Sequence, residues 1–198
     1  TYNSEEDQKA ASHVFQLPEP AADGPRTKVD LAGPWQIARY DDPDMDIDTY
    51  EPIKKVPAKD EYDLKWMGTT VPDKKLNSNP ELKFAHRVIY RTKVDVPAAH
   101  KGRGFKLHFQ GTHWIASVII NGKYVGYRKS VWIPWDMDVS DFIEPGRINE
   151  IVIGIKGHYY AFDLNHWDKT KEGLDGIRNR PQSYTKNIKQ IASLAPST

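Results

Sequence analysis

The sequence predicts an all-β sandwich, and three observations lead to this fold class. Several short segments alternate apolar and polar residues with the period of two that is typical of a half-buried strand. Glycine and proline turns separate these segments at short intervals. Helical periodicity does not extend beyond about two turns, apart from a weak pattern near NIKQIASL at 187–194. We therefore expect a sandwich or jelly roll of mostly antiparallel strands.

The first part of the chain contains two weaker strand patterns between irregular stretches. Residues 1–28 are polar and interrupted by proline and glycine, which predicts an extended lead-in. The first strand pattern is DLAGPWQIARY at 30–40. Residues 41–63 are acidic and contain several prolines, and we expect them to form a long surface excursion. A second short strand is predicted in KWMGTTVP at 65–72.

Three later segments have the clearest strand patterns. RVIYRTKVDVP at 87–97 alternates over most of its length and ends at a proline. GFKLHFQG at 104–111 directs its phenylalanines and its leucine to one face and lies between two glycines. GRINEIVIGI at 146–155 follows a Pro-Gly turn and is rich in isoleucine. These segments predict three strands of the sandwich.

An Asn-Gly pair in ASVIINGKYVGY at 116–127 predicts a tight hairpin. A type I′ turn needs positive φ at both central residues, and Asn-Gly tolerates this best. With these two residues as the loop, the expected cross-strand pairs are Ile119 with Tyr124, Val118 with Val125, and Ala116 with Tyr127. The last two pairs would then lie on the core face of the hairpin.

The bulk composition excludes several classes of partner. The formal net charge is +1, so the protein has no overall positive electrostatic field that would attract nucleic acid or an anionic membrane. No apolar run approaches the roughly 20 residues that span a bilayer, and the N-terminus shows no basic-then-apolar leader. The absence of cysteine is compatible with the cytosol and with an oxidising compartment. Localisation therefore stays open, and a secreted or periplasmic location is favoured if a signal peptide has been removed.

No pattern in the sequence predicts a catalytic centre, a metal site or a cofactor. The carboxylates of Asp136, Asp138 and Asp141 could serve as an acid–base pair or as calcium ligands. Aspartate and serine clustered after a strand more often form turns. The seven histidines lack the spacing of a zinc site, and neither cysteine nor Gly-x-Ser-x-Gly provides a nucleophile. We therefore expect no catalytic residue, no metal and no cofactor in this chain.

Aromatic residues make up 11% of the chain, and those outside the strand patterns are the remaining candidates for a site. A sugar has an apolar C–H face and polar hydroxyl edges, so a ring beside polar side chains forms the minimal pocket. Two regions have this composition, GTHWIA at 111–116 and GHYYAFDLNHWDK at 157–169, and YRKSVWIPW at 127–135 adds a third edge. In that third segment, Trp132 and Trp135 are assigned mainly to closing the sandwich. The candidate carbohydrate-binding residues are His113, Trp114, Arg128, Tyr159, Tyr160, Asp163, Asn165, His166 and Trp167.

The order of these features resembles a known family. A strand ending in proline, a strand closing on glycine, an Asn-Gly hairpin, an aromatic-Pro element and an Asn-led apolar strand follow one another as in the sugar-binding jelly-roll domain of family-2 glycoside hydrolases, the β-galactosidase and β-glucuronidase group. The resemblance covers about residues 30–160. The matching residues are Ala116, Val118, Asn121, Gly122, Val125, Gly126, Pro134, Asp138, Val139, Gly146 and Asn149.

The resemblance implies a galactose-binding-like jelly roll. In those enzymes this domain precedes an immunoglobulin-like domain and a catalytic (β/α)₈ barrel that holds both catalytic glutamates. Together with the composition of the two terminal segments, this predicts a polar extended lead-in over 1–28, the sandwich over 29–167, and an irregular arm or linker to a further domain over 168–198. The sequence departs from the family's pattern at two places. The first is the long insertion between Tyr40 and Lys65, and the second is the connection to the next domain, where Arg178 replaces the family's aromatic residue.

Three functions follow as alternatives. The first is a non-catalytic accessory domain of a glycoside hydrolase, whose partners are a carbohydrate (a β-glycoside or polysaccharide fragment) and the other domains of the enzyme. The second is a stand-alone carbohydrate-binding module. The third is a protein-interaction or adhesion domain that uses the same aromatic surface. Neither a nucleic acid nor a membrane is expected as a partner, and this chain alone is expected not to catalyse hydrolysis.

Overall fold

The computed structural model describes residues 4–21, 26–40, 52–72, 79, 82, 85, 87–131 and 133–156. Its helices and strands in chain order are α1 (Glu5–Ser12), β1 (Phe15–Gln16), β2 (Gly33–Arg39), β3 (Met67–Val71), β4 (Arg87–Val96), a single-turn 3₁₀ helix (Ala98–His100), β5 (Lys106–Phe109), β6 (His113–Ile120), β7 (Lys123–Val131), β8 (Trp135–Asp138) and β9 (Arg147–Lys156). Every segment in which the sequence predicts a strand contains one. In the described part of the chain, no helix is long and apolar enough to cross a membrane.

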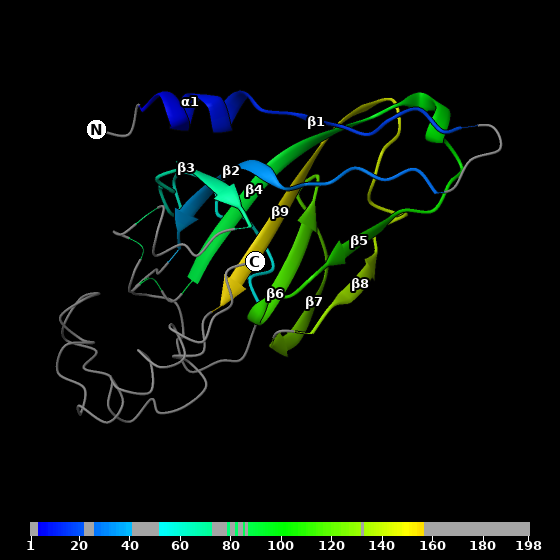
Figure 1. The fold of residues 1–198 in the computed structure, drawn as a ribbon. Coiled ribbons are helices and arrows are strands. Elements are labelled where there is room, and N and C mark those ends of the chain that lie inside the picture. The colour runs from blue at the N-terminus through cyan, green and yellow to red at the C-terminus, as the bar shows by residue number, and fades with distance from the viewer. Residues whose placement is uncertain are drawn as a thin grey trace, which may run out of the picture.

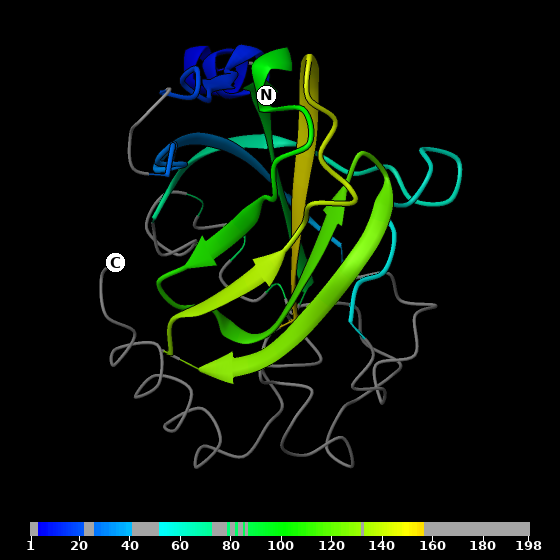
Figure 2. The same ribbon diagram turned by 90° about the vertical axis from the view of Figure 1, so that its right-hand side faces the viewer.

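The described strands form two layers (Figures 1 and 2). The larger sheet has the order β3-β2-β4-β9-β6-β7, with β1 paired to the C-terminal part of β4, and the smaller sheet consists of β5 and β8. The short β1–β4 pair is parallel, whereas the other pairs are antiparallel. This arrangement confirms the all-β sandwich that the sequence predicts.

The main core lies between these two sheets. Alternate residues of the central strands point into it, because successive side chains of a strand point to opposite faces. The predicted inward residues of β5 and its flank pack against this core. Its buried members are Phe15, Trp35, Val94, Val96, Ala116, Val118, Ile120, Trp135, Val139, Ile143, Ile151 and Ile153.

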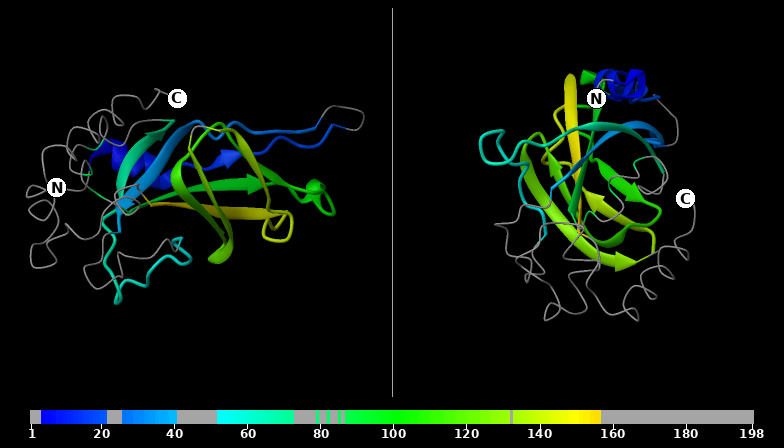
Figure 3. Two further views of the ribbon diagram at one scale, coloured as in Figure 1. Left: turned by 90° about the horizontal axis from the view of Figure 1, so that it is seen from below. Right: turned by 90° about the vertical axis from the view of Figure 1, so that its left-hand side faces the viewer.

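Residues 52–66 lie against the opposite face of the large sheet (Figure 3). Ile53 is only 4% exposed and packs with Ile89, Ile119 and Val152 of the sheet. Gly154 permits this close approach, since a Cβ there would lie 2.7 Å from the Cβ of Ile53. The prediction of a surface excursion is therefore wrong for the apolar residues of this segment, which cover this face of the large sheet. Residues 41–51 lie outside the described residues.

The N-terminal segment also differs from the expected extended lead-in. Ser4 caps α1 reciprocally with Asp7: each backbone N–H donates to the other side chain at 3.1 Å. The Asp7 carboxylate also accepts from the backbone N–H of Gly68 in β3, and this contact is the main cause that lowers the pKa of Asp7. Acidic residues in a first turn favour a helix N-terminus even where the composition is polar.

The predicted hairpin turns at Asn121 and Gly122. Both have positive φ, 51° and 77°, as a type I′ turn requires. Ile119 pairs with Tyr124, which confirms the expected register next to the turn.

A β-bulge at Val125 changes the register further from the turn. Val118 pairs with the residue after Val125, and Ala116 pairs with Arg128 rather than with Tyr127. A shift of one residue moves every later side chain to the other face of the sheet. The expected core position of Tyr127 is therefore wrong: Tyr127 is 46% exposed. Arg128, instead of Tyr127, lies opposite Ala116 and on the same face of the sheet.

Two asparagines clamp the turn of this hairpin to the start of β9. The amide nitrogen of Asn121 donates to Oδ1 of Asn149 (2.8 Å) and to the carbonyl of Phe142 (3.0 Å). Oδ1 of Asn121 accepts from the backbone N–H of Glu150 at 3.0 Å. Asn149 is fully buried, and its own amide donates to the carbonyl of Glu144. We call this region the clamped end of the sandwich.

Candidate functional site

Three of the predicted site residues come together where β6 begins and β7 ends (Figure 1). His113 opens β6, and Trp114 is opposite Ser130 of β7. Two positions further along β6, Ala116 is opposite Arg128. The backbone thus places Trp114 and Arg128 on adjacent strands, two register positions apart. We call this the candidate end, and it lies at the other end of the hairpin from the clamped asparagines.

The remaining predicted residues fall outside the described residues: Tyr159, Tyr160, Asp163, Asn165, His166 and Trp167. The last described strand, β9, ends close to the candidate end. β9 ends at Lys156, which pairs with Ile115, the residue after Trp114. β9 therefore ends beside the candidate end.

Arg128 is the predicted site residue whose side chain the structure describes, and it is exposed. Its guanidinium group carries five N–H donors in a fixed planar arrangement, which suits carboxylates and paired hydroxyl groups. Sequence periodicity alone would have placed Arg128 on the face opposite Ala116. The bulge at Val125 instead places Arg128 opposite the core residue Ala116, on the same face of the sheet.

Trp135 supports the candidate end from within the core. Its ring stacks on Phe109 with centroids 4.0 Å apart and an interplanar angle of 9°. Its indole N–H donates to Oγ1 of Thr112 at 3.1 Å, and Thr112 immediately precedes His113. Because Trp135 is only 4% exposed, it closes the sandwich, as expected. It can position the site but does not present a face to a ligand.

The connection from β7 to β8 presents an apolar surface next to these residues in the sequence. Ile133 is 59% exposed, and Pro134 is exposed as well. Single exposed apolar residues are common on protein surfaces, so these two do not by themselves define a binding surface.

Two of the three carboxylates that were considered for catalysis, those of Asp136 and Asp138, make exposed local contacts. Asp136 accepts a hydrogen bond from His108 across the small sheet at 2.7 Å, and this bond is the main cause that lowers the pKa of Asp136. Asp138 accepts from the backbone N–H and the hydroxyl of Ser140, which confirms the expected turn. Among the described residues, no group of three or more His, Asp or Glu side chains could hold a metal ion.

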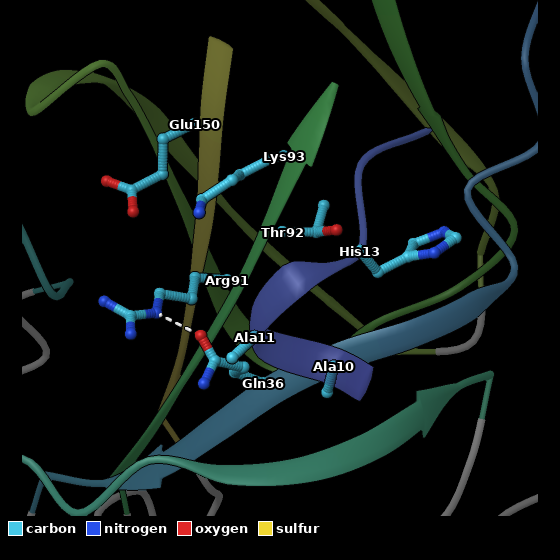
Figure 4. A pocket seen from close by; sticks show the side chains of 8 residues that line it. All are labelled: Ala10, Ala11, His13, Gln36, Arg91, Thr92, Lys93 and Glu150. Atoms are coloured by element: carbon cyan, nitrogen blue, oxygen red, sulfur yellow. Dashed lines mark hydrogen bonds between the residues drawn. The ribbon is translucent and has the colours of Figure 1, made fainter. Parts of the chain in front are cut away.

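A shallow polar hollow lies elsewhere, between α1 and β4 (Figure 4). There the Nε–H of Arg91 donates to Oε1 of Gln36 at 2.8 Å, and the guanidinium carbon lies 3.9 Å from the ring centroid of Trp66. Burial lowers the pKa of Arg91, and the nearby Glu150 carboxylate opposes this shift. Sequence reasoning missed this cluster, because Gln36, Trp66 and Arg91 are far apart in the chain. None of the predicted site residues lines it.

Comparisons with solved structures show the same fold in a larger enzyme. Two structures of β-glucuronidase from Ruminococcus gnavus, one with uronic deoxynojirimycin and one with a C6-substituted uronic isofagomine, each superpose with a TM-score of 0.50. Each is 21% identical to this chain and covers 64% of it, whereas the chain covers 21% of that enzyme. At this identity the likeness concerns the fold.

Sequence comparisons lead to the same group of enzymes. A β-galactosidase from Thermoanaerobacter pseudethanolicus is 30% identical over 63 residues, which are 32% of this chain and 8% of that protein. A β-glucuronidase from Formosa agariphila is 24% identical over 138 residues, which are 65% of this chain and 12% of that protein. The chain thus spans a small part of the length of these relatives. The family described as glycosyl hydrolase 2 galactose-binding domain-like matches residues 35–186. The chain therefore belongs to this galactose-binding domain-like family of the glycosyl hydrolase 2 group.

Proposed function

We propose that this chain is a non-catalytic accessory β-sandwich domain of a larger family-2-like glycoside hydrolase. In this role it supports carbohydrate recognition, and another domain carries out hydrolysis. The family match over residues 35–186 carries the proposal. Further support comes from the relatives, of which this chain spans only 8% and 12% of the length. Most of each relative is therefore available for a catalytic domain.

The candidate end would supply the carbohydrate contacts. Trp114 and Arg128 lie on adjacent strands there, and β9 ends beside Trp114 at Lys156. An aromatic residue beside a guanidinium group combines stacking with directional hydrogen bonding, the combination that a sugar or an acidic sugar requires. The Ruminococcus gnavus enzyme was solved with uronic ligands, so an acidic β-glycoside is the first ligand to test.

A turnover assay tests the non-catalytic role. The purified 198-residue chain is incubated with chromogenic β-glucuronides and β-galactosides, and we expect no release of the chromophore above the buffer rate. Turnover that disappears in Asp136→Asn would overturn the proposal, because a carboxylate of this chain would then perform the chemistry.

A binding experiment tests the supporting role. In the hydrolase that contains this chain, Arg128→Ala should raise KM for an acidic β-glycoside by about tenfold with little change in kcat, because it removes a charge-assisted contact made before the reaction. Arg103→Ala is the matched control, since Arg103 is also exposed but lies in the loop before β5. Equal KM values for both variants would contradict the proposed site. Tight, saturable sugar binding by the isolated chain would favour a stand-alone module instead.

A further inference from the structure

The turn that anchors the clamped end contains a chemically labile pair. Asn121-Gly122 is the single Asn-Gly dipeptide in the sequence. In such a pair the backbone nitrogen of glycine can attack the side-chain amide carbon of asparagine. Glycine favours this attack because it has no Cβ that would hinder the approach or restrict the backbone.

The reaction needs only water as a co-reactant. A bond forms between the nitrogen of Gly122 and Cγ of Asn121, and the bond from Cγ to Nδ2 breaks. The proton lost by the backbone nitrogen leaves with Nδ2 as ammonia. The resulting succinimide is opened by water to aspartate or isoaspartate. No group is oxidised or reduced.

The folded structure opposes the first step. To bring Cγ of Asn121 toward the nitrogen of Gly122, the side chain must rotate away from its three partners. This rotation breaks the two bonds donated by Nδ2, to Asn149 at 2.8 Å and to Phe142 at 3.0 Å, and the bond accepted from Glu150 at 3.0 Å. Asn149 cannot follow the movement, because it is fully buried and is hydrogen-bonded to both backbone groups of Glu144.

The same geometry disfavours the product. In the clamp, Nδ2 of Asn121 faces two oxygen acceptors, the carbonyl of Phe142 and Oδ1 of Asn149. An aspartate at position 121 has only acceptors when ionised, so it would place an anion against these two oxygens. Isoaspartate additionally lengthens the backbone of a two-residue turn whose φ angles are both positive. The reacted hairpin therefore cannot rebuild the clamp.

We propose that Asn121 is a conditional deamidation site, which the native clamp protects and which reacts when the hairpin opens. Each reaction from the opened state removes a molecule from the pool that can refold. Reversible opening at this end of the sandwich thereby becomes irreversible loss of the native protein. The clamp controls the chemical lifetime of the domain in addition to its folding stability.

Peptide mass spectrometry can follow the site directly. Trypsin releases residues 107–123, in which Asn121 is the single asparagine. The protein is incubated at mildly alkaline pH, and the deamidated fraction of this peptide is measured over time in buffer and in denaturing urea. We expect deamidation to be at least about tenfold slower in the native protein, because the reaction must await opening of the hairpin. Equal rates in the two solutions would overturn the proposal.

A variant separates the clamp from global stability. Asn149→Ala removes one partner of Asn121 and should raise the native deamidation rate several-fold. Gly154→Ala is the matched control, because it strains the packing against Ile53 and leaves the hydrogen bonds of Asn121 in place. Equal acceleration in two equally destabilised variants would overturn a specific role of the clamp. If Asn149→Ala does not fold, the ratio of wild-type rates in buffer and in urea decides the question alone.

Discussion

The two ends of the β6–β7 hairpin contrast in how their polar groups are used. At the clamped end, the side-chain amides of Asn121 and Asn149 are hydrogen-bonded within the protein. At the candidate end, Arg128 is exposed to solvent, and the neighbouring support comes from the stacked and hydrogen-bonded ring of Trp135. One hairpin therefore joins an end held by internal hydrogen bonds to an end where the guanidinium group of Arg128 is exposed.

This contrast indicates where substitutions should affect folding and where they should affect binding. A buried polar group that loses its partner destabilises the protein by its full desolvation penalty, whereas an exposed one is satisfied by water. The clamped end should therefore dominate stability, and the candidate end should tolerate truncation of its exposed side chains. The following predictions test this difference, beginning with the largest effect.

Asn149→Ala should lower the free energy of unfolding by about 3 kcal/mol, because several buried hydrogen bonds are lost together. Urea denaturation followed by tryptophan fluorescence measures this change. Asn121→Ala should give a smaller loss, since Asn121 is only partly buried. A loss below about 1 kcal/mol for Asn149→Ala would show that the clamp is not the stabilising end of the hairpin.

Thr112→Val should lower the free energy of unfolding by about 1 kcal/mol, the typical net contribution of one hydrogen bond. The substitution keeps the size of the side chain and removes the acceptor for the indole N–H of Trp135. Amide hydrogen exchange at residues 112–115 should become faster as the ring loses its anchor. Unchanged exchange there would mean that Trp135 does not position the candidate end.

Arg128→Ala should change the free energy of unfolding by no more than about 0.5 kcal/mol, as for most exposed side chains. The rise in KM predicted for this variant should therefore occur without a loss of stability. Thermal unfolding of the same preparation used for kinetics gives the comparison. A clear drop in Tm would assign Arg128 to the fold rather than to ligand binding.

The smallest effect concerns acid stability at Asp136. The hydrogen bond from His108 lowers the pKa of this carboxyl, so its stabilising contribution is present above the unfolded pKa of about 3.9 and is lost as the pH falls through the folded value. Asp136→Asn should be slightly less stable than the wild type at about pH 6 and nearly equal to it at about pH 3. Urea midpoints of both proteins at the two pH values measure this difference in stability. A difference that does not become smaller at the lower pH would contradict a stabilising role of the ionised Asp136 carboxyl.

Much of the sandwich could be predicted because its signals are local. Alternation in 87–97 predicts β4, the isoleucine-rich run after the Pro-Gly turn in 146–155 predicts β9, and the Asn-Gly pair predicts the hairpin turn. The helix α1 was missed because its eight residues are polar and its main anchor, the backbone of Gly68, is distant in sequence. The cover formed by residues 52–66 was missed for a similar reason, since its few apolar residues lie among charges and prolines.

The sequence by itself determined the fold class and the turn at Asn121 and Gly122. Each depends on residues that are close together in the chain. Only the tertiary structure decided that Arg128, rather than Tyr127, pairs with Ala116. The bulge that causes this pairing depends on hydrogen bonds between two strands, and it leaves no fixed pattern in the sequence of either strand. It likewise decided that β9 ends beside β6 at the candidate end, since sheet order depends on the packing of the whole core.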